Sequence, residues 1–212
     1  MRIKICGVTT PEDARAAALL GADAIGLNFY APSPRFISRD TAAAVLAELP
    51  PAVEAVGVFV DRSMDVVAEE VRPLSRLNSV QWHGREREPA SASPLPLIAA
   101  FSVRGPESLE EIGAYLDRCR EHGRLPAAVL VDAHVPGQRG GTGQTAPWEL
   151  LASFRPGVPL ILAGGLTPEN VAQAVRIVRP HAVDVASGVE SGPGRKDAQK
   201  MRRFIENARA MS

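Results

Sequence analysis

The chain has 212 residues, of which 45% are hydrophobic and 23% charged, a composition typical of globular proteins. Basic and acidic residues number 24 each, so broad attraction to nucleic acid or to an anionic membrane is not expected. Two cysteines, Cys6 and Cys119, are too few for a disulfide framework or a four-cysteine zinc site. No apolar run approaches the roughly 18 residues of a membrane span, and no secretory signal is visible, so we expect a cytoplasmic protein.

Short apolar runs alternate along the chain with longer segments of helical spacing. Several of these runs are rich in valine and isoleucine, as strands are. Thr10-Pro11 and Thr167-Pro168 resemble capped helix starts with proline at the first helical position. The alternation predicts parallel β/α units, with strands at 2–6, 24–29, 55–60, 79–82, 97–101, 127–132, 159–163 and 182–186.

Strands that are apolar on both faces fit either an open doubly wound sheet or a closed barrel. The count of eight favours a (β/α)8 TIM barrel, and no linker divides residues 1–212 into separate domains. The proline- and serine-rich stretch 85–96 predicts that the fourth helix is short or irregular. The five basic residues between Arg195 and Arg203 are expected on the solvent-exposed face of a last helix.

Chemically capable side chains stand where the predicted strands end, which is where barrels of this type carry reactive groups. Cys6 is either a small buried hydrophobe or a base, and Asp132 either caps a loop or acts as an acid. Arg35 either anchors a loop or clamps a substrate carboxylate with its planar fork. His83 is either a structural hydrogen-bonding group or a participant. The histidines share no metal-ligand spacing, so no metal is expected.

Lys4 is one of only three lysines and lies two residues before Cys6, on the same side of the first strand. A buried ammonium group is costly unless it is paired. We therefore expect Lys4 inside the barrel, paired with Asp184 or Asp132. In that position its charge is expected to lower the pKa of the Cys6 thiol.

Glycine-rich turns follow the last two strands, at Gly164-Gly165 and at Ser187-Gly188. Such turns either close tightly or let main-chain amides approach an anion. Barrels often hold phosphate in the loops after the seventh and eighth strands, so these turns form a candidate phosphate site.

An ordered series of motifs resembles the phosphoribosylanthranilate isomerase family over essentially the whole chain. Single motifs are unspecific, but the ordered set is specific. The motifs are Lys4-Ile5-Cys6-Gly7, Ser33-Pro34-Arg35-Phe36-Ile37, Val56-Gly57-Val58-Phe59-Val60, Val80-Gln81-Trp82-His83-Gly84, Val131-Asp132, Gly140-Gly141-Thr142-Gly143, Leu162-Ala163-Gly164-Gly165-Leu166, Val183-Asp184-Val185-Ala186-Ser187-Gly188-Val189-Glu190 and Pro193-Gly194-Arg195-Lys196-Asp197.

The resemblance implies a cofactor-free enzyme of tryptophan biosynthesis. Its reaction is the Amadori rearrangement of N-(5-phosphoribosyl)anthranilate to 1-(2-carboxyphenylamino)-1-deoxyribulose 5-phosphate. Cys6 would be the general base, Asp132 the general acid, and Arg35 the partner of the anthranilate carboxylate. The chain would be a monomer or homodimer whose partner is this small molecule alone.

Further residues would bind substrate if the resemblance holds. His83 and Asp184 are candidates inside the barrel, and the loop through Gly141 and Thr142 would close over the site. Gly164, Gly165, Ser187 and Gly188 would hold the phosphate. The chain departs from the family pattern at Ala146-Pro147-Trp148, where Phe-Asp-Trp is common, and at Trp82, where leucine is usual. We interpret both departures as changes in loop packing.

Two alternatives remain at this point. One is a sister isomerase of histidine synthesis, acting on a phosphoribosyl-formimino carboxamide, or one enzyme that serves both pathways. That chemistry is associated with two aspartates, whereas the first strand here ends in Cys6. The other is a barrel that binds a phosphorylated ligand without catalysis.

Overall fold

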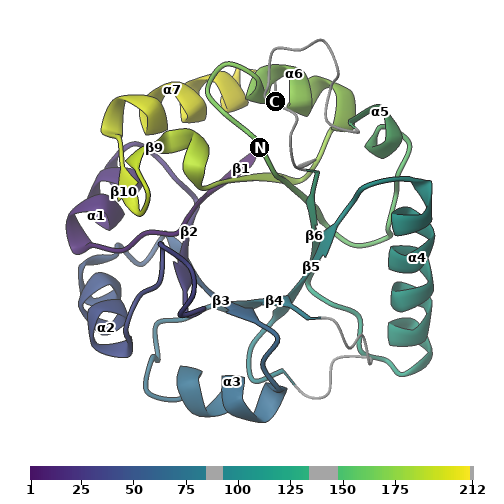
Figure 1. Cartoon of the computed structure of the whole chain (residues 1–212), viewed down its shortest axis with the longest axis horizontal. Helices are drawn as coiled ribbons and strands as arrows, with labels where there is room; N and C mark the ends of the chain where they lie inside the picture. The colour runs from purple at the N-terminus through teal and green to yellow at the C-terminus, as the bar shows by residue number, and fades with distance from the viewer. Residues whose placement is uncertain (85–92, 134–147, 211–212) are drawn as a thin grey trace.

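A computed structural model describes residues 1–84, 93–133 and 148–210 of the chain. Eight parallel strands close into a barrel in chain order, β1 pairing with both β2 and β8, and helices surround it (Figure 1). Each strand lies within one residue of its predicted ends, so the closed barrel is confirmed over the open sheet. The strands are β1 Arg2–Cys6, β2 Ala24–Asn28, β3 Glu54–Val60, β4 Ser79–His83, β5 Leu97–Ser102, β6 Ala128–Asp132, β7 Leu160–Ala163 and β8 Ala182–Val185.

Helices follow the strands on the outside of the barrel. They are α1 Pro11–Leu19, α2 Arg39–Glu48, α3 Met64–Val71, α4 Pro106–Glu121, α5 Trp148–Leu151, α6 Val171–Val178 and α7 Ala198–Arg209. Thr10 caps α1 as predicted, its Oγ1 accepting from Asp13 N at 3.1 Å. The second predicted start is wrong by three residues, because Thr167 begins a turn and α6 starts only after Asn170. Residues 93–96, before β5, are not helical, and 85–92 lie outside the described residues.

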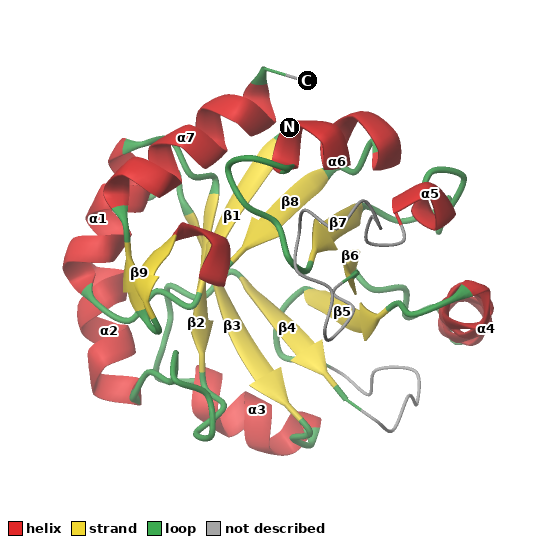
Figure 2. Ribbon diagram, turned by 45° about the horizontal axis from the view of Figure 1, so that its top comes forward, coloured by secondary structure: helices red, strands yellow, loops and turns green. Residues whose placement is uncertain are grey.

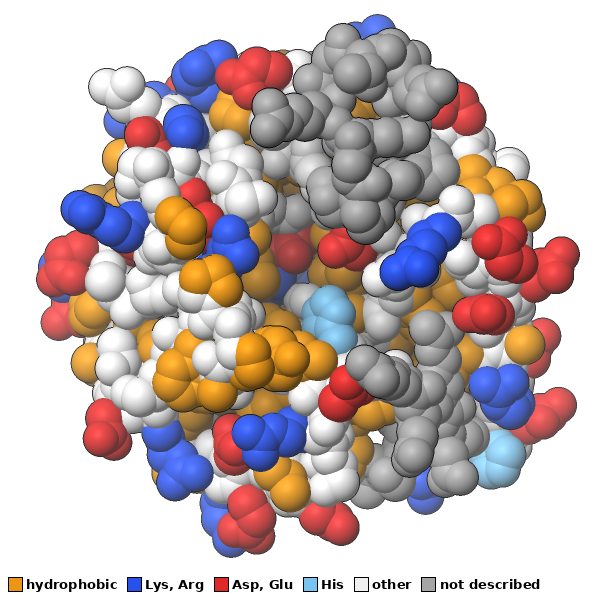
Figure 3. Space-filling view, in the orientation of Figure 1, with side chains coloured by type: hydrophobic (Ala, Val, Ile, Leu, Met, Phe, Trp, Pro, Cys, Tyr) orange, Lys and Arg blue, Asp and Glu red, His pale blue; other side chains and the backbone are white. Residues whose placement is uncertain are grey.

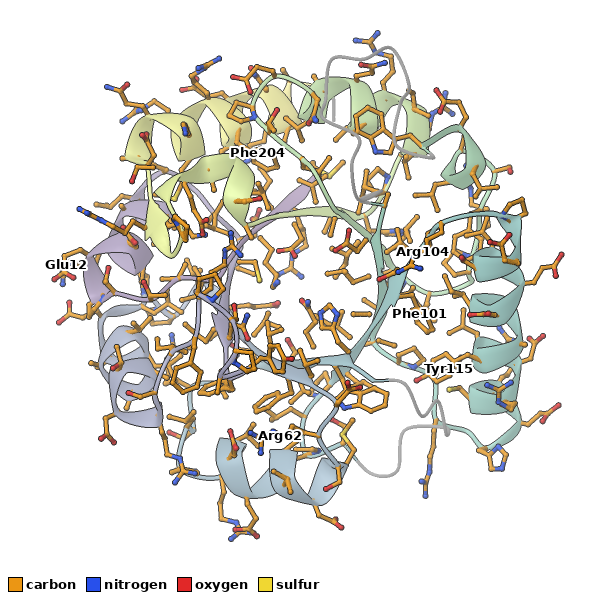
Figure 4. The ribbon with its side chains drawn as sticks, viewed as in Figure 1. Glu12, Arg62, Phe101, Arg104, Tyr115 and Phe204 are labelled. Atoms are coloured by element: carbon orange, nitrogen blue, oxygen red, sulfur yellow. The ribbon has the colours of Figure 1, made fainter. Side chains whose placement is uncertain are left out.

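The apolar core has two layers. The larger lies between the strands and the helices, where Phe101 of β5 meets Tyr115 of α4 edge-on at 5.4 Å and Phe204 of α7 is fully buried (Figure 4). The smaller lies inside the barrel and is built mainly from alanine and branched aliphatic side chains. Its members are Ala24, Val56, Ile98, Ala100, Ala128, Leu130, Ile161 and Ala163. Small residues here leave the interior room for polar groups nearer the mouth.

A short hairpin separates β8 from the last helix. The 3-10 helix η1, Ser187–Val189, leads into β9, Glu190–Gly192, which pairs antiparallel with β10, Arg195–Lys196. The hairpin lies beside α1, and Lys196 N donates to Asp13 Oδ2 at 3.1 Å (Figures 1 and 2). The expectation of an exposed helix face is therefore wrong for Arg195 and Lys196, which belong to β10, and Lys196 is buried. It is confirmed for Lys200, Arg202 and Arg203, which are exposed on α7.

Within the described part of the chain, no helix is both long and apolar enough to cross a membrane.

Candidate active site

The carboxyl ends of the strands gather polar side chains at one mouth of the barrel. Cys6 ends β1, His83 ends β4 and Asp132 ends β6, so all three predicted residues lie at the same end of the parallel barrel. Acidic, basic and histidine side chains surround a hollow at the centre of the face in Figure 3. Asp184 lies deeper, within β8, and is buried.

The sulfur of Cys6 fits against β2 because residue 26 is glycine. A Cβ at Gly26 would lie 2.7 Å from Cys6 Sγ, closer than real Cβ contacts, and 3.1 Å from Lys4 Nζ, closer than most of them. Burial first, and then the charge of Asp184, raise the pKa of the Cys6 thiol, while Lys4 and Lys196 lower it. The balance is a raised pKa, so the expectation of a lowered one is wrong. Lys4 stands where it was predicted, but Asp184 already neutralises its charge.

Lys4 is paired inside the barrel, as predicted, and its partner is Asp184. Lys4 Nζ lies 2.9 Å from Asp184 Oδ1, and both side chains are less than 10% exposed. Burial alone would lower the pKa of Lys4, but Asp184 and Cys6 outweigh it and the pKa is raised. The ammonium also donates to Gln81 Oε1 at 2.9 Å. Lys4 is therefore a permanent cation held by two fixed acceptors.

His83 is the last residue of β4 and lies nearer the mouth of the barrel than the Lys4–Asp184 pair. Its Nε2 lies 2.8 Å from Gln81 Nε2, two residues earlier on the same face of the strand. Burial, and then the charge of Lys4, lower the pKa of His83, although Asp132, Asp184 and Asp61 act in the opposite direction. The ring is therefore neutral at physiological pH.

Arg35 is held at the mouth by Glu190 of β9. Its Nε and Nη2 donate to the two carboxylate oxygens at 2.8 and 2.7 Å. Lys196 Nζ donates to the same carboxylate at 2.8 Å, and Glu190 is buried. Burial alone would raise the pKa of Glu190, but the hydrogen bonds from Arg35 and Lys196 lower it. Glu190 uses only two of the five guanidinium N–H groups, which leaves Arg35 able to bind a second anion.

Sequence reasoning missed three of these residues. Glu190 stood in a quoted motif without a role, and Lys196 was placed on an exposed helix face. Gln81 was also quoted without a role, although its spacing from His83 and its place in an apolar run point to the barrel interior. No local signal in the sequence joins Glu190 to Arg35, which lies 155 residues away.

The two glycine-rich turns lie against each other at the same mouth. Gly164 and Gly165 have φ of +90° and +63°, directly after β7. A Cβ at Gly188 would overlap the Leu166 carbonyl oxygen, so only glycine allows the turn after β7 to touch η1. Loops after the seventh and eighth strands with a short extra helix are the common phosphate site of barrels. Gly141 and Thr142 lie outside the described residues.

A closed barrel that gathers a thiol, a carboxyl group, a guanidinium and paired glycine turns at its carboxyl mouth has the architecture of a (β/α)8-barrel enzyme. The family model described as N-(5'phosphoribosyl)anthranilate (PRA) isomerase matches residues 3–207. The chain belongs to this family and is an aldose-ketose isomerase of tryptophan biosynthesis. Membership of this family rules out the alternative of a barrel that binds a phosphorylated ligand without catalysis.

Relatives of known name and structure agree over the whole chain. The N-(5'-phosphoribosyl)anthranilate isomerase of Geobacter sp. (strain M21) is 45% identical and covers 100% of this chain and 99% of its own. The crystal structure of the Thermotoga maritima phosphoribosyl anthranilate isomerase superposes with a TM-score of 0.85 at 38% identity, covering 99% of each chain. A phosphoribosyl anthranilate isomerase in complex with reduced 1-(o-carboxyphenylamino)-1-deoxyribulose 5-phosphate gives 0.83 at 36% identity, also over 99% of each chain.

Proposed function

We propose that Cys6 and Asp132 carry the acid-base chemistry by which this chain converts N-(5-phosphoribosyl)anthranilate to 1-(2-carboxyphenylamino)-1-deoxyribulose 5-phosphate. The observation that supports these roles is their placement: the thiol ends β1 and the carboxyl group ends β6, at the mouth that also carries the paired glycine turns. Proton donors and acceptors on both sides of a bound sugar are what this isomerisation requires.

In the first half of the reaction, Asp132 in its protonated form donates to the furanose ring oxygen as the bond from that oxygen to C1 breaks. The anilino nitrogen supplies the electron pair and becomes an iminium. The iminium acidifies the C2 proton, which the Cys6 thiolate removes to give an enolamine.

In the second half, the enolamine becomes the ketone. The C2 hydroxyl gives its proton to the Asp132 carboxylate, and C1 receives a proton from the Cys6 thiol. Both groups return to their starting protonation states, so every proton in the cycle is accounted for by these two side chains and the substrate.

Binding would use the remaining predicted residues. We assign the anthranilate carboxylate to the N–H groups of Arg35 that Glu190 leaves unused, and the phosphate to the turns at Gly164-Gly165 and Ser187-Gly188. The product analogue in the related structure has both of these anionic ends in one molecule. Contacts from His83, Asp184, Gly141 and Thr142 remain predictions.

We further propose that the chain works in the cytoplasm on this small molecule alone, without nucleic acid or membrane. Its zero net charge and its two free cysteines support this. A related Thermotoga maritima enzyme is described as dimeric. A monomer or homodimer is our prediction here, and light scattering of the purified protein distinguishes the two.

The decisive experiment follows the fluorescence of the anthranilate substrate as it is consumed. Cys6→Ser and Asp132→Asn should each lower kcat by about 10² to 10⁴, the usual contribution of a placed acid or base. Cys119→Ala, which changes the buried cysteine of α4 outside the mouth, is the matched control and should retain activity. Full activity in either mouth variant would reject the role assigned to that residue.

A further inference from the structure

We infer that Gln81 is a positioning residue that fixes the tautomer of His83, so that the ring presents an Nδ1–H donor to an oxygen of the bound substrate. The substrate contact rests on the proposed function, whereas the tautomer is a property of the free protein. Gln81 itself is 2% exposed and lies below His83, so it acts through the histidine rather than on the substrate.

Lys4 determines the orientation of the Gln81 amide, because an ammonium group can only donate hydrogen bonds. Asp184 Oδ1 holds Lys4 Nζ at 2.9 Å, and Gln81 Oε1 lies at the same distance from it. The carbonyl oxygen of the Gln81 amide must therefore face Lys4. The reverse orientation would place two donors against each other inside the barrel.

The orientation of the amide then decides the state of the imidazole. With its oxygen on Lys4, Gln81 presents its NH₂ group to His83 Nε2 at 2.8 Å. Since that group is a donor, Nε2 must be the acceptor and the ring proton must be on Nδ1. An imidazolium is disfavoured for the same reason, because it would direct a second N–H at the amide.

The surroundings of the ring agree with a neutral imidazole. Burial first, and then the charge of Lys4, lower the pKa of His83 and outweigh Asp132, Asp184 and Asp61, which act in the opposite direction. The Nδ1–H is then the ring's remaining polar group. His83 is only half-buried at the mouth, so this donor is within reach of a ligand, whereas Gln81 is not.

The first test is the ¹⁵N spectrum of the wild-type protein labelled at histidine nitrogens, recorded between pH 7 and 8. We expect His83 to show a protonated Nδ1 and an unprotonated Nε2 across this range. An Nε2–H tautomer or an imidazolium signal would overturn the inference. This measurement needs neither catalysis nor a variant, so its outcome is independent of the roles proposed for Cys6 and Asp132.

Variants of Gln81 supply the second test. Gln81→Met removes the donor and should give a mixture of tautomers. Gln81→Glu replaces the donor by an acceptor and should move the proton to Nε2 and raise the pKa of His83. We expect kcat/KM to fall about tenfold in Gln81→Met, the effect of one hydrogen bond. Gln173→Met on the exposed face of α6 is the matched control and should change neither quantity. A loss of kcat/KM with an unchanged tautomer would contradict the positioning role.

Discussion

At the scale of single residues, the thiol of Cys6 is governed by opposing charges. Burial and Asp184 raise its pKa, and the opposite effect of Lys4 and Lys196 offsets only part of this increase. The resting thiol is therefore neutral at physiological pH, and the chemistry runs through a small thiolate fraction. A thiolate with a high pKa is the stronger base toward a carbon-bound proton, so a low population is offset in part by higher reactivity.

The rate of alkylation by iodoacetamide measures that thiolate fraction directly. In a Cys119→Ala background, we expect the rate at Cys6 to rise through pH 7 to 10 with a midpoint above pH 9, because the raised pKa keeps the thiol protonated below it. Lys4→Met removes a charge that lowers this pKa and should slow alkylation further. Arg72→Met, on an exposed pair with Glu69, should have no effect. A midpoint below pH 8 would contradict the balance of charges described here.

The sequence predicted where the side chains of the candidate site lie, but not how their charges shift the pKa of the Cys6 thiol. Cys6 and Asp132 could be found because they end apolar runs, and the burial of Lys4 followed from strand periodicity. The direction of the shift in the thiol pKa could not be predicted, because it depends first on how deeply the thiol is buried and then on Asp184. Asp184 lies 178 residues further along the chain, and closure of the barrel sets its distance from Cys6.

At the scale of elements, the β9–β10 hairpin acts as the support of Arg35. Glu190 in β9 binds Arg35 from the loop after β2, while Lys196 in β10 donates to Oε1 of the same carboxylate, the oxygen that also accepts from Arg35 Nε. Lys200 of α7 adds a hydrogen bond to the Glu190 carbonyl at 2.7 Å. These contacts fix a long, flexible side chain before substrate arrives, which reduces the entropy lost on binding.

Glu190→Gln should therefore affect binding more than chemistry. The variant keeps the shape of the side chain but weakens the bidentate pair, so Arg35 becomes less ordered. We expect KM to rise about tenfold and kcat to change less than twofold, as for an interaction made equally in ground and transition states. Steady-state kinetics measure both constants. Glu169→Gln, which weakens an exposed pair with Arg203, is the control and should leave both unchanged. A fall in kcat at constant KM would place Glu190 in the chemical step instead.

The sequence could not predict this hairpin. Its strands have three and two residues, too short for a periodic signal, and the basic residues of β10 look locally like the start of the last helix. The long elements were predictable because each has its own pattern, whereas the hairpin depends on ion pairs between segments far apart in the chain.

At the scale of the whole molecule, the barrel is closed by β1, which joins β2 to β8. The count of eight apolar runs predicted this closure, since eight parallel strands fill their own interior. Closure brings Lys4 against Asp184, 180 residues apart, and against Gln81 of β4 across the interior. The same ion pair therefore lies in the barrel interior beneath the candidate site and adds a side-chain contact to the backbone pairing of β1 with β8.

Breaking that pair should be costly in a way that breaking a surface pair is not. Lys4→Met leaves Asp184 buried without its cation, and we expect the free energy of unfolding to fall by about 3 to 5 kcal/mol. Because the pKa of Lys4 is raised in the folded protein, this contribution is fully present at pH 7 and is lost only as the pH rises above 10.5. Urea denaturation at pH 7 measures the change.

Two variants make this prediction specific to the buried charge. Arg2→Met, on the same strand, breaks an exposed pair with Glu54 and should cost less than about 1 kcal/mol. The double variant Lys4→Met/Asp184→Leu removes both charges and should recover much of the lost stability, because no ion is then left unpaired in the interior. If Lys4→Met costs no more than Arg2→Met, or if the second substitution only adds to the loss, the interior pair does not stabilise the barrel as a buried ion pair should.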